Sequence, residues 1–199
     1  MRIAAITLVA LLLSAVNSFA ITGLGIGVRG GYITGLDMGG IEDGVKLLDP
    51  NAEVDDQMTM VGAHLRVGTL PIIDFDIAAE YAWKNMELYD DYKLDFKILA
   101  VTATGFYKIL PTPMITPYVG LGVGSYTLTY DIKTPAGSTP VFDPDKTTKF
   151  GYHGVIGAKI KPPMFPLGFF ARYRYTYIST EDDATKFSTI LVGATFSLP

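Results

Sequence analysis

The stretch DFDIAAEYAWK, residues 74–84, decides the fold, because its side chains alternate between two chemistries with a period of two. One face would carry Phe75, Ile77, Ala79, Tyr81 and Trp83, and the other Asp74, Asp76, Ala78, Glu80, Ala82 and Lys84. Successive side chains of a β-strand point to opposite sides of the sheet, so this alternation predicts a strand with one apolar face and one charged face.

The same alternation recurs along the chain. Eight segments show it, near residues 22–34, 58–69, 73–85, 93–108, 116–131, 149–161, 168–179 and 187–198. No segment has a helical period, and nothing marks a second domain. The sequence therefore predicts an all-β protein with one eight-stranded antiparallel domain.

The connections between these segments alternate in length. Short Pro-rich links at 70–72, 110–113 and 162–166 follow the second, fourth and sixth segments, whereas long polar connections span 35–57 and 132–148. Short turns at one end and long loops at the other are typical of an up-and-down transmembrane β-barrel with extracellular long loops. An even number of strands places both ends of the domain on the periplasmic side.

The greasy face is predicted to meet lipid, although alternation alone also fits a soluble barrel with an apolar core. The predicted lipid face has aromatic side chains near both strand ends, as interface girdles do, and the opposite face is rich in glycine, as a narrow lumen requires. The girdle residues are Phe75, Phe106, Phe169 and Phe196 at one level and Tyr32, Trp83, Phe96, Tyr152 and Tyr177 at the other. In segment 93–108 this assignment turns Leu94, Phe96, Ile98, Ala100 and Phe106 outward and Asp95, Lys97, Val101 and Gly105 inward.

Residues 1–20 are predicted to be a cleavable signal peptide. Arg2 precedes an apolar run over residues 3–16, and Ser18 and Ala20 supply the small residues of a cleavage site. The mature domain would then span residues 21–199, with the formal charge falling from −4 to −5 because Arg2 is the only charged residue removed. That charge argues against nucleic acid as a partner. The absence of cysteine excludes disulfides and thiolate metal sites.

The charged side chains of the inward faces form the candidate site. We expect a salt-bridge network within the lumen, because charges sealed in a narrow barrel must pair. Its predicted members are Arg29, His64, Arg66, Asp76, Glu80, Lys84, Asp95, Lys97, Arg172 and Arg174. Hairpin geometry places Arg66 opposite Asp76, His64 near Glu80 and Lys84 opposite Asp95, and Glu80 is expected to anchor the cluster.

Other constellations do not predict catalysis or a cofactor. Residues 25–30 match the G-x-G-x-x-G spacing, but they lie inside a strand, whereas a dinucleotide site requires that run to open a helix. His64 and His153 are the only histidines, and neither has an obvious nucleophile or orienting acid along its strand. We therefore predict no catalytic residue, no metal site and no cofactor.

Three short motifs resemble small outer-membrane barrels of the OmpA/OmpW type. They are PYVGLGVGSY at 117–126, RYRYT at 172–176 and GATF at 193–196. Those families usually end on an aromatic residue, whereas this chain ends Phe196-Ser197-Leu198-Pro199. The resemblance implies the barrel architecture and a location in the cell outer membrane, reached through the periplasm.

The expected function is that of a non-enzymatic outer-membrane barrel with a structural or surface-interaction role. The alternative is a narrow porin-like channel for small or hydrophobic solutes. The expected partners are outer-membrane lipids, including lipopolysaccharide, and the barrel assembly machinery. The sequence does not determine an oligomeric state.

Overall fold

The computed structural model describes residues 23–37, 57–70, 72–87, 93–110, 112, 114–133, 146–163, 165–179 and 184–198. The predicted signal peptide at 1–20 lies outside these residues. No helix among the described residues is both long and apolar enough to cross a membrane.

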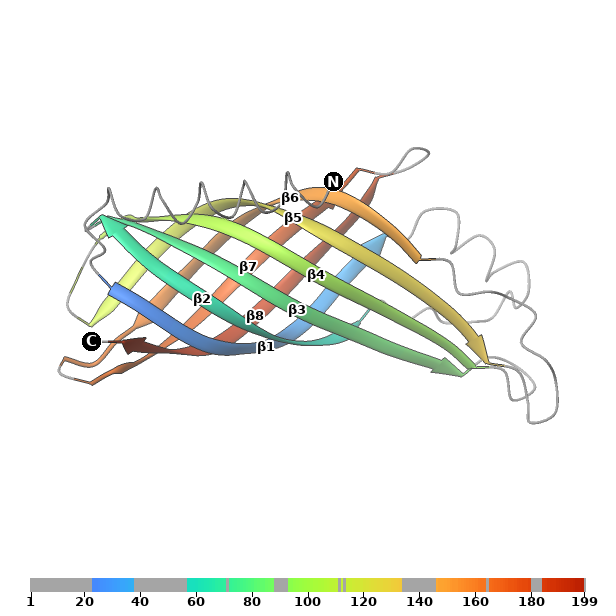
Figure 1. Ribbon diagram of the computed structural model, residues 1–199, viewed down its shortest axis with the longest axis horizontal. Coiled ribbons are helices and arrows are strands. Elements are labelled where there is room, and N and C mark those ends of the chain that lie inside the picture. The colour runs from blue at the N-terminus through green and yellow to red at the C-terminus, as the bar shows by residue number, and fades with distance from the viewer. Residues whose placement is uncertain are drawn as a thin grey trace, which may run out of the picture.

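Eight strands make up the described structure (Figure 1). They are β1 (Gly23–Asp37), β2 (Met58–Leu70), β3 (Ile73–Glu87), β4 (Lys93–Lys108), β5 (Ile115–Lys133), β6 (Lys146–Ile160), β7 (Leu167–Ile178) and β8 (Thr185–Leu198). Each strand lies close to a segment predicted from the alternation, and the longest, β5, extends the prediction of 116–131 at both ends.

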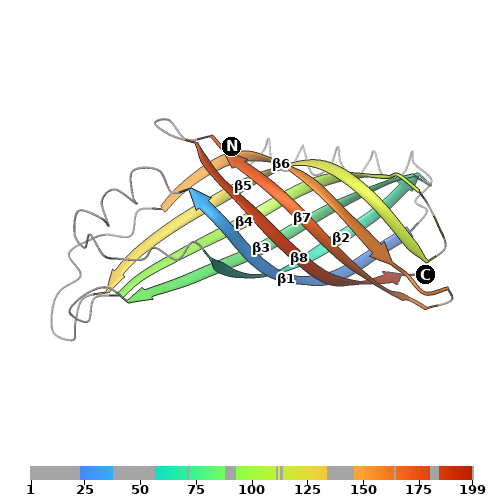
Figure 2. The same ribbon diagram turned by 180° about the vertical axis from the view of Figure 1, so that it is seen from behind.

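The strands close into a barrel in chain order. Each strand pairs antiparallel with the next, and β8 returns to pair with β1, where Leu24 lies opposite Leu198. All eight strands tilt relative to the long axis in both views (Figures 1 and 2). Closure leaves no strand edge unpaired, which is the condition for strands to cross lipid. The predicted eight-stranded antiparallel meander is therefore confirmed.

The two ends of the barrel differ in their connections. The links β2–β3, β4–β5 and β6–β7 are short and lie at the end where β1 begins and β8 ends, on the left of Figure 1. Thr112 organises the β4–β5 link, because its hydroxyl donates to the Ile115 carbonyl and accepts the Ile115 amide. We name this the short-turn end, and in bacterial outer-membrane barrels such an end faces the periplasm.

The outer surface of the barrel is apolar and the charged side chains lie inside. Exposed apolar side chains lie on every strand; aliphatic examples are Val28, Ile77, Leu99, Leu121, Ile156 and Val192, and those of β7 are mainly aromatic. The buried polar and charged residues include Arg29, Asp76, Glu80 and Arg174. A soluble barrel would have the reverse arrangement, so this surface requires an apolar surrounding such as lipid.

The face assignment predicted for β4 is wrong. Phe96 and Phe106 are buried in the lumen and are not girdle residues, and Ile98 and Ala100 are buried with them, whereas Val101 is 53% exposed. The reason is that both faces of β4 are largely apolar, so the alternation does not reveal which one faces inward. Cross-strand register settles the question, because Leu99 pairs with the outward-facing Tyr81 of β3.

Candidate functional site in the barrel lumen

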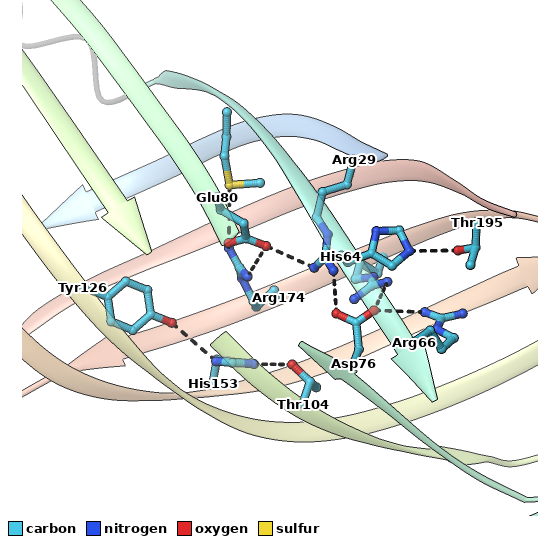
Figure 3. Close-up of polar contacts among 12 residues, drawn as sticks. Arg29, His64, Arg66, Asp76, Glu80, Thr104, Tyr126, His153, Arg174 and Thr195 are labelled. Carbon is cyan, nitrogen blue, oxygen red and sulfur yellow. Dashed lines mark hydrogen bonds and ion pairs between the residues drawn. The ribbon is translucent and has the colours of Figure 1, made fainter. Parts of the chain in front are cut away.

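A chain of ion pairs crosses the middle of the lumen (Figure 3). Arg29 of β1 links the two carboxylates of β3, with its Nη2 2.5 Å from Asp76 Oδ1 and its Nη1 3.1 Å from Glu80 Oε1. Arg174 of β7 approaches Glu80 from the other side, with Nη2 2.8 Å from Oε2 and Nη1 2.9 Å from Oε1. Three strands that are far apart in sequence are thus joined through two carboxylates.

Two further arginines surround Asp76. Arg66 lies opposite it in the β2–β3 register, as the hairpin geometry predicts, with Nη2 3.7 Å from Oδ2. Arg172 places its Nη2 3.9 Å from the same oxygen. Both distances exceed a hydrogen bond, so these contacts are electrostatic. Four arginines therefore share two carboxylates, and the centre of the lumen has an excess of positive charge.

Aromatic rings on the short-turn side make cation–π contacts with Arg66 and Arg172, the two arginines that do not hydrogen-bond to Asp76 or Glu80. The guanidinium of Arg172 lies 4.1 Å from the ring centroid of Phe170 and 4.9 Å from that of Phe106. Arg66 lies over the same two rings at 5.5 and 5.3 Å. Cation–π contacts of this kind partly replace the hydration that a buried guanidinium loses. Phe106, predicted to face lipid, in fact supports the charged cluster.

The two histidines occupy matching environments. His64 Nε2 lies 2.9 Å from Thr195 Oγ1, and His153 Nε2 lies 2.9 Å from Thr104 Oγ1. In each case the ring passes over a glycine of the strand in between, Gly27 for the first pair and Gly122 for the second.

A Cβ atom at either glycine would collide with the ring. It would lie 2.5 Å from His64 Cε1 at Gly27 and 2.3 Å from His153 Nε2 at Gly122. The close approach explains why these two wall positions carry no side chain. We name each Thr–Gly–His set, one on β8–β1–β2 and one on β4–β5–β6, a clasp.

The clasps lack the features of a catalytic base. A general base of the triad type needs a third group to orient its ring, and His64 Nδ1 has no hydrogen-bond partner among the described residues. His153 Nδ1 lies 3.4 Å from the Tyr126 hydroxyl, its one partner within the described strands. Among the described residues, no three His, Asp or Glu side chains lie together as metal ligands. The arrangement fits hydrogen-bonded structural histidines.

Apolar side chains fill the lumen beyond the ion pairs, toward the long connections. This apolar plug comprises Ile33, Leu36, Met58, Met60, Ala82, Phe96, Ile98, Ala100, Tyr126, Leu128, Ile178, Phe187 and Leu191, all buried. The cavity between the plug and the Glu80–Arg174 pair measures about 10 Å³, which is room for a single water molecule. The described lumen is therefore packed at this level.

Some predicted members lie outside the network. Lys97 pairs with Trp83 on the outward-facing register of β4, so its placement in the lumen is wrong. Asp95 lies opposite Asn85, and Lys84 lies opposite Phe96, so the predicted Lys84–Asp95 pairing is off by one residue. His64 bonds to Thr195 rather than to Glu80.

The prediction also missed Thr104, Thr195 and the pair of Lys108 Nζ with Asp74 Oδ1 at 2.8 Å. The alternation of β8 would have signalled Thr195, whereas the alternation of β4, which was assigned the wrong way round, placed Thr104 on the lipid face.

The remaining girdle aromatics face outward near the two barrel ends. Phe75, Phe169 and Phe196 are exposed near the short turns, and Tyr32 and Tyr152 are exposed toward the other end. Trp83 and Tyr177 are half-exposed at that second level. Tyr152 stacks on Tyr177 with ring centroids 4.9 Å apart, and Tyr81 stacks on Trp83 at 5.8 Å.

The architecture is shared with solved bacterial outer-membrane proteins. The Neisserial surface protein A structure aligns with a TM-score of 0.58 at 14% identity, covering 88% of this chain and 97% of that one. Ail of Yersinia pestis, solved with the heparin analogue sucrose octasulfate, gives 0.52 at 18% identity, with 88% and 97% covered. OprG of Pseudomonas aeruginosa gives 0.50 at 16% identity, with 90% and 98% covered. At these identities the likeness shows the fold.

Sequence comparison places the chain in a family. No curated protein matches it significantly in sequence. The model of the outer membrane protein beta-barrel domain, however, matches residues 5–197, nearly the whole chain. The chain therefore belongs to the outer membrane protein beta-barrel domain family and is a protein of the cell outer membrane.

Proposed function

We propose that this protein is a non-enzymatic outer-membrane barrel with a closed lumen and a structural or surface-interaction role. The observation that carries the proposal is the packing of the lumen, in which the Glu80 carboxylate is 98% buried between Arg29 and Arg174 with the apolar plug beside it. An ion crossing the barrel would have to separate these pairs and displace the plug. Eight-stranded barrels have interiors that side chains just fill, which agrees with a closed state.

The ion-pair network has a structural role in this proposal. Its arginines come from β1, β2 and β7 and converge on β3. Arg66 pairs with the adjacent strand, whereas Arg29 and Arg174 reach β3 from strands that are not its neighbours. Burying two carboxylates and four guanidinium groups is unfavourable unless they pair well. The network therefore stabilises one arrangement of the strands over others, rather than providing a conductive path.

The surface role follows from the composition of the first long connection. Residues 38–56 contain one lysine and six carboxylates, Glu42, Asp43, Asp49, Glu53, Asp55 and Asp56, which lie outside the described residues. Ail has been solved with a sulfated heparin analogue, whereas a segment with this charge would repel sulfate and phosphate groups alike unless cations lie between them. We propose that the partners are lipopolysaccharide and other outer-membrane lipids, with divalent cations bridging carboxylates and lipid phosphates, and that the barrel assembly machinery inserts the chain.

Single-channel recording in planar lipid bilayers tests the closed lumen. The purified full chain should insert without steady conductance, while a general porin reconstituted in the same way provides the positive control. Resistance to SDS before boiling, read as a change in gel migration, verifies that the inserted protein is folded. Steady anion-selective conductance from folded protein would refute the closed lumen and favour the narrow porin-like channel.

A further inference from the structure

A polar cavity opens into the barrel at the short-turn end. Its volume is about 480 Å³, and it lies among the first residues of β1, the last residues of β8 and the ends of β2, β4 and β6. Four of its lining side chains are cationic, Arg66, Lys108, Lys159 and Lys161, and one is anionic, Asp74. Four positive charges and one negative charge give this basic mouth a net formal charge of +3, in a protein whose overall charge is negative.

Arg66 lies at the inner limit of the basic mouth. It is 95% buried, its Nε has no hydrogen-bond partner among the described residues, and its Nη2 faces Asp76 Oδ2 at 3.7 Å without a hydrogen bond. The Phe106 and Phe170 ring centroids lie 5.3 and 5.5 Å from its guanidinium carbon. A buried guanidinium with unused donors is costly unless a ligand or water accepts from it. Its planar fork suits an oxyanion with two acceptor oxygens.

The lysines of the basic mouth are positioned by the barrel wall. Lys159 lies opposite Phe170 in the inward register of β6, so it belongs to the lumen rather than to the lipid face. It interacts electrostatically with Arg66, Lys161 and Lys108, which oppose its charge, and with Asp74, which favours it. Lys161 donates from Nζ to Ser197 Oγ at 3.0 Å. Lys108 pairs with Asp74, so the single carboxylate of the cavity lining is shared among four cations.

We infer that the basic mouth is a binding site for a phosphate-bearing anion that enters from the periplasmic end of the barrel. Several convergent cations favour a dianion over a single carboxylate, with Arg66 offering a fork and the lysines point charges. The cavity is large enough for a phosphate with an attached organic group. A soluble phosphate ester and the headgroup of an anionic phospholipid share this chemistry. The inference goes beyond the closed-lumen function, because a site at one mouth needs no path through the barrel.

Isothermal titration calorimetry of the full chain, refolded in zwitterionic detergent, tests the inference with sn-glycerol 3-phosphate as the probe. We expect one binding site per chain, with affinity that falls as salt rises. Lys159→Gln and Lys161→Gln should each weaken binding by roughly tenfold, the effect of removing one charge-assisted contact. Asp74→Asn should tighten binding, because it removes the only carboxylate in the cavity lining and releases Lys108.

Lys97→Gln is the matched control. It removes the same charge from the outward register of β4 and should leave the affinity unchanged. Each variant is first shown to be folded by its resistance to SDS before boiling. The absence of binding, or equal weakening by Lys97→Gln and Lys159→Gln, would overturn the inference, because both results would mean that the basic mouth does not recognise phosphate.

Nanodiscs separate the two sources of the anion. The titration is repeated in phosphatidylcholine discs and in discs that also contain phosphatidylglycerol. Weaker apparent binding of sn-glycerol 3-phosphate in the discs that contain phosphatidylglycerol would support the site with a lipid headgroup as its occupant. In that case the difference between the two kinds of disc should disappear in Lys159→Gln. Equal binding in both discs would support the site with a soluble phosphate ester as its occupant.

Discussion

The two halves of the lumen are filled by different kinds of side chain. Toward the long connections, the apolar plug excludes water by packing alone. Toward the short turns, arginines, carboxylates and aromatic rings share the space, and the barrel opens into the basic mouth. The side chains of the apolar plug need only close packing, whereas each charged side chain of the other half needs an ion-pair or cation–π partner. The described lumen is therefore packed and apolar toward the long connections, and polar with an open cavity toward the short turns.

Glu80 lies at the boundary between the two halves, and its loss should have the largest effect. Glu80→Ala leaves Arg174 without its carboxylate and Arg29 with Asp76 alone. Stranding a buried charge costs about 3–5 kcal/mol of unfolding free energy. Urea unfolding in lipid vesicles, followed by the fluorescence of Trp83, the only tryptophan, measures this loss.

Lys97→Ala is the control for Glu80→Ala, since it removes a charge from the outward register and should change the unfolding free energy little. Similar midpoints for Glu80→Ala and Lys97→Ala would mean that the ion pairs do not stabilise the barrel.

Met58→Ala probes the apolar plug. Met58 is fully buried near the end of the plug, and truncating a buried methionine costs about 2–5 kcal/mol because a cavity remains. Val61→Ala, at a lipid-facing position of the same strand, should cost less, because lipid fills the space that the side chain leaves. The same urea titration compares the two. A larger loss for Val61→Ala would show that the plug is loosely packed and would weaken the contrast between the halves.

Thr195→Val gives the smallest expected effect. The substitution keeps the shape of the side chain and removes the hydroxyl that bonds to His64, at a cost of about 1 kcal/mol. Thr104→Val makes the same change in the other clasp and should cost a similar amount. Unfolding titrations of both variants and of the double variant measure the two costs. Neutral results for both would mean that the hydroxyls do not contribute to stability.

The alternation of polar and apolar residues along each segment was sufficient to predict the eight strands and the inward face of β3. In β3 the acidic residues at 74, 76 and 80 identify the inward face without further information, and the short β2–β3 link fixes Arg66 opposite Asp76. In β4 the apolar plug makes the inward face as greasy as the outward one, so the same rule reversed Phe96 and Phe106. The two-residue alternation identifies the inward face only where the two faces of a strand differ in polarity. It cannot do so where the side chains that face the lumen are also apolar.

Contacts across the lumen lie beyond any local rule. The narrowness of an eight-stranded barrel predicts that Arg172 and Arg174 reach Glu80 across the lumen, and Arg174 does bond to it, 94 positions away. Sequence spacing does not reveal its other bonded partner, Arg29, 51 positions away. These pairings depend on strand stagger around the whole circumference and on side-chain reach. Hairpin register gives neighbours along the wall, whereas the closed barrel gives partners across it.

The two clasps have the same geometry but should form at different times. The bond between His153 and Thr104 joins residues 49 positions apart and needs only β4, β5 and β6 in place. The bond between His64 and Thr195 spans 131 positions and crosses the seam between β1 and β8. Loop-closure entropy opposes the longer connection, so it waits for the last strand to dock. The environment of His64 is thus a marker of the final step of folding, and that of His153 a marker of an earlier one.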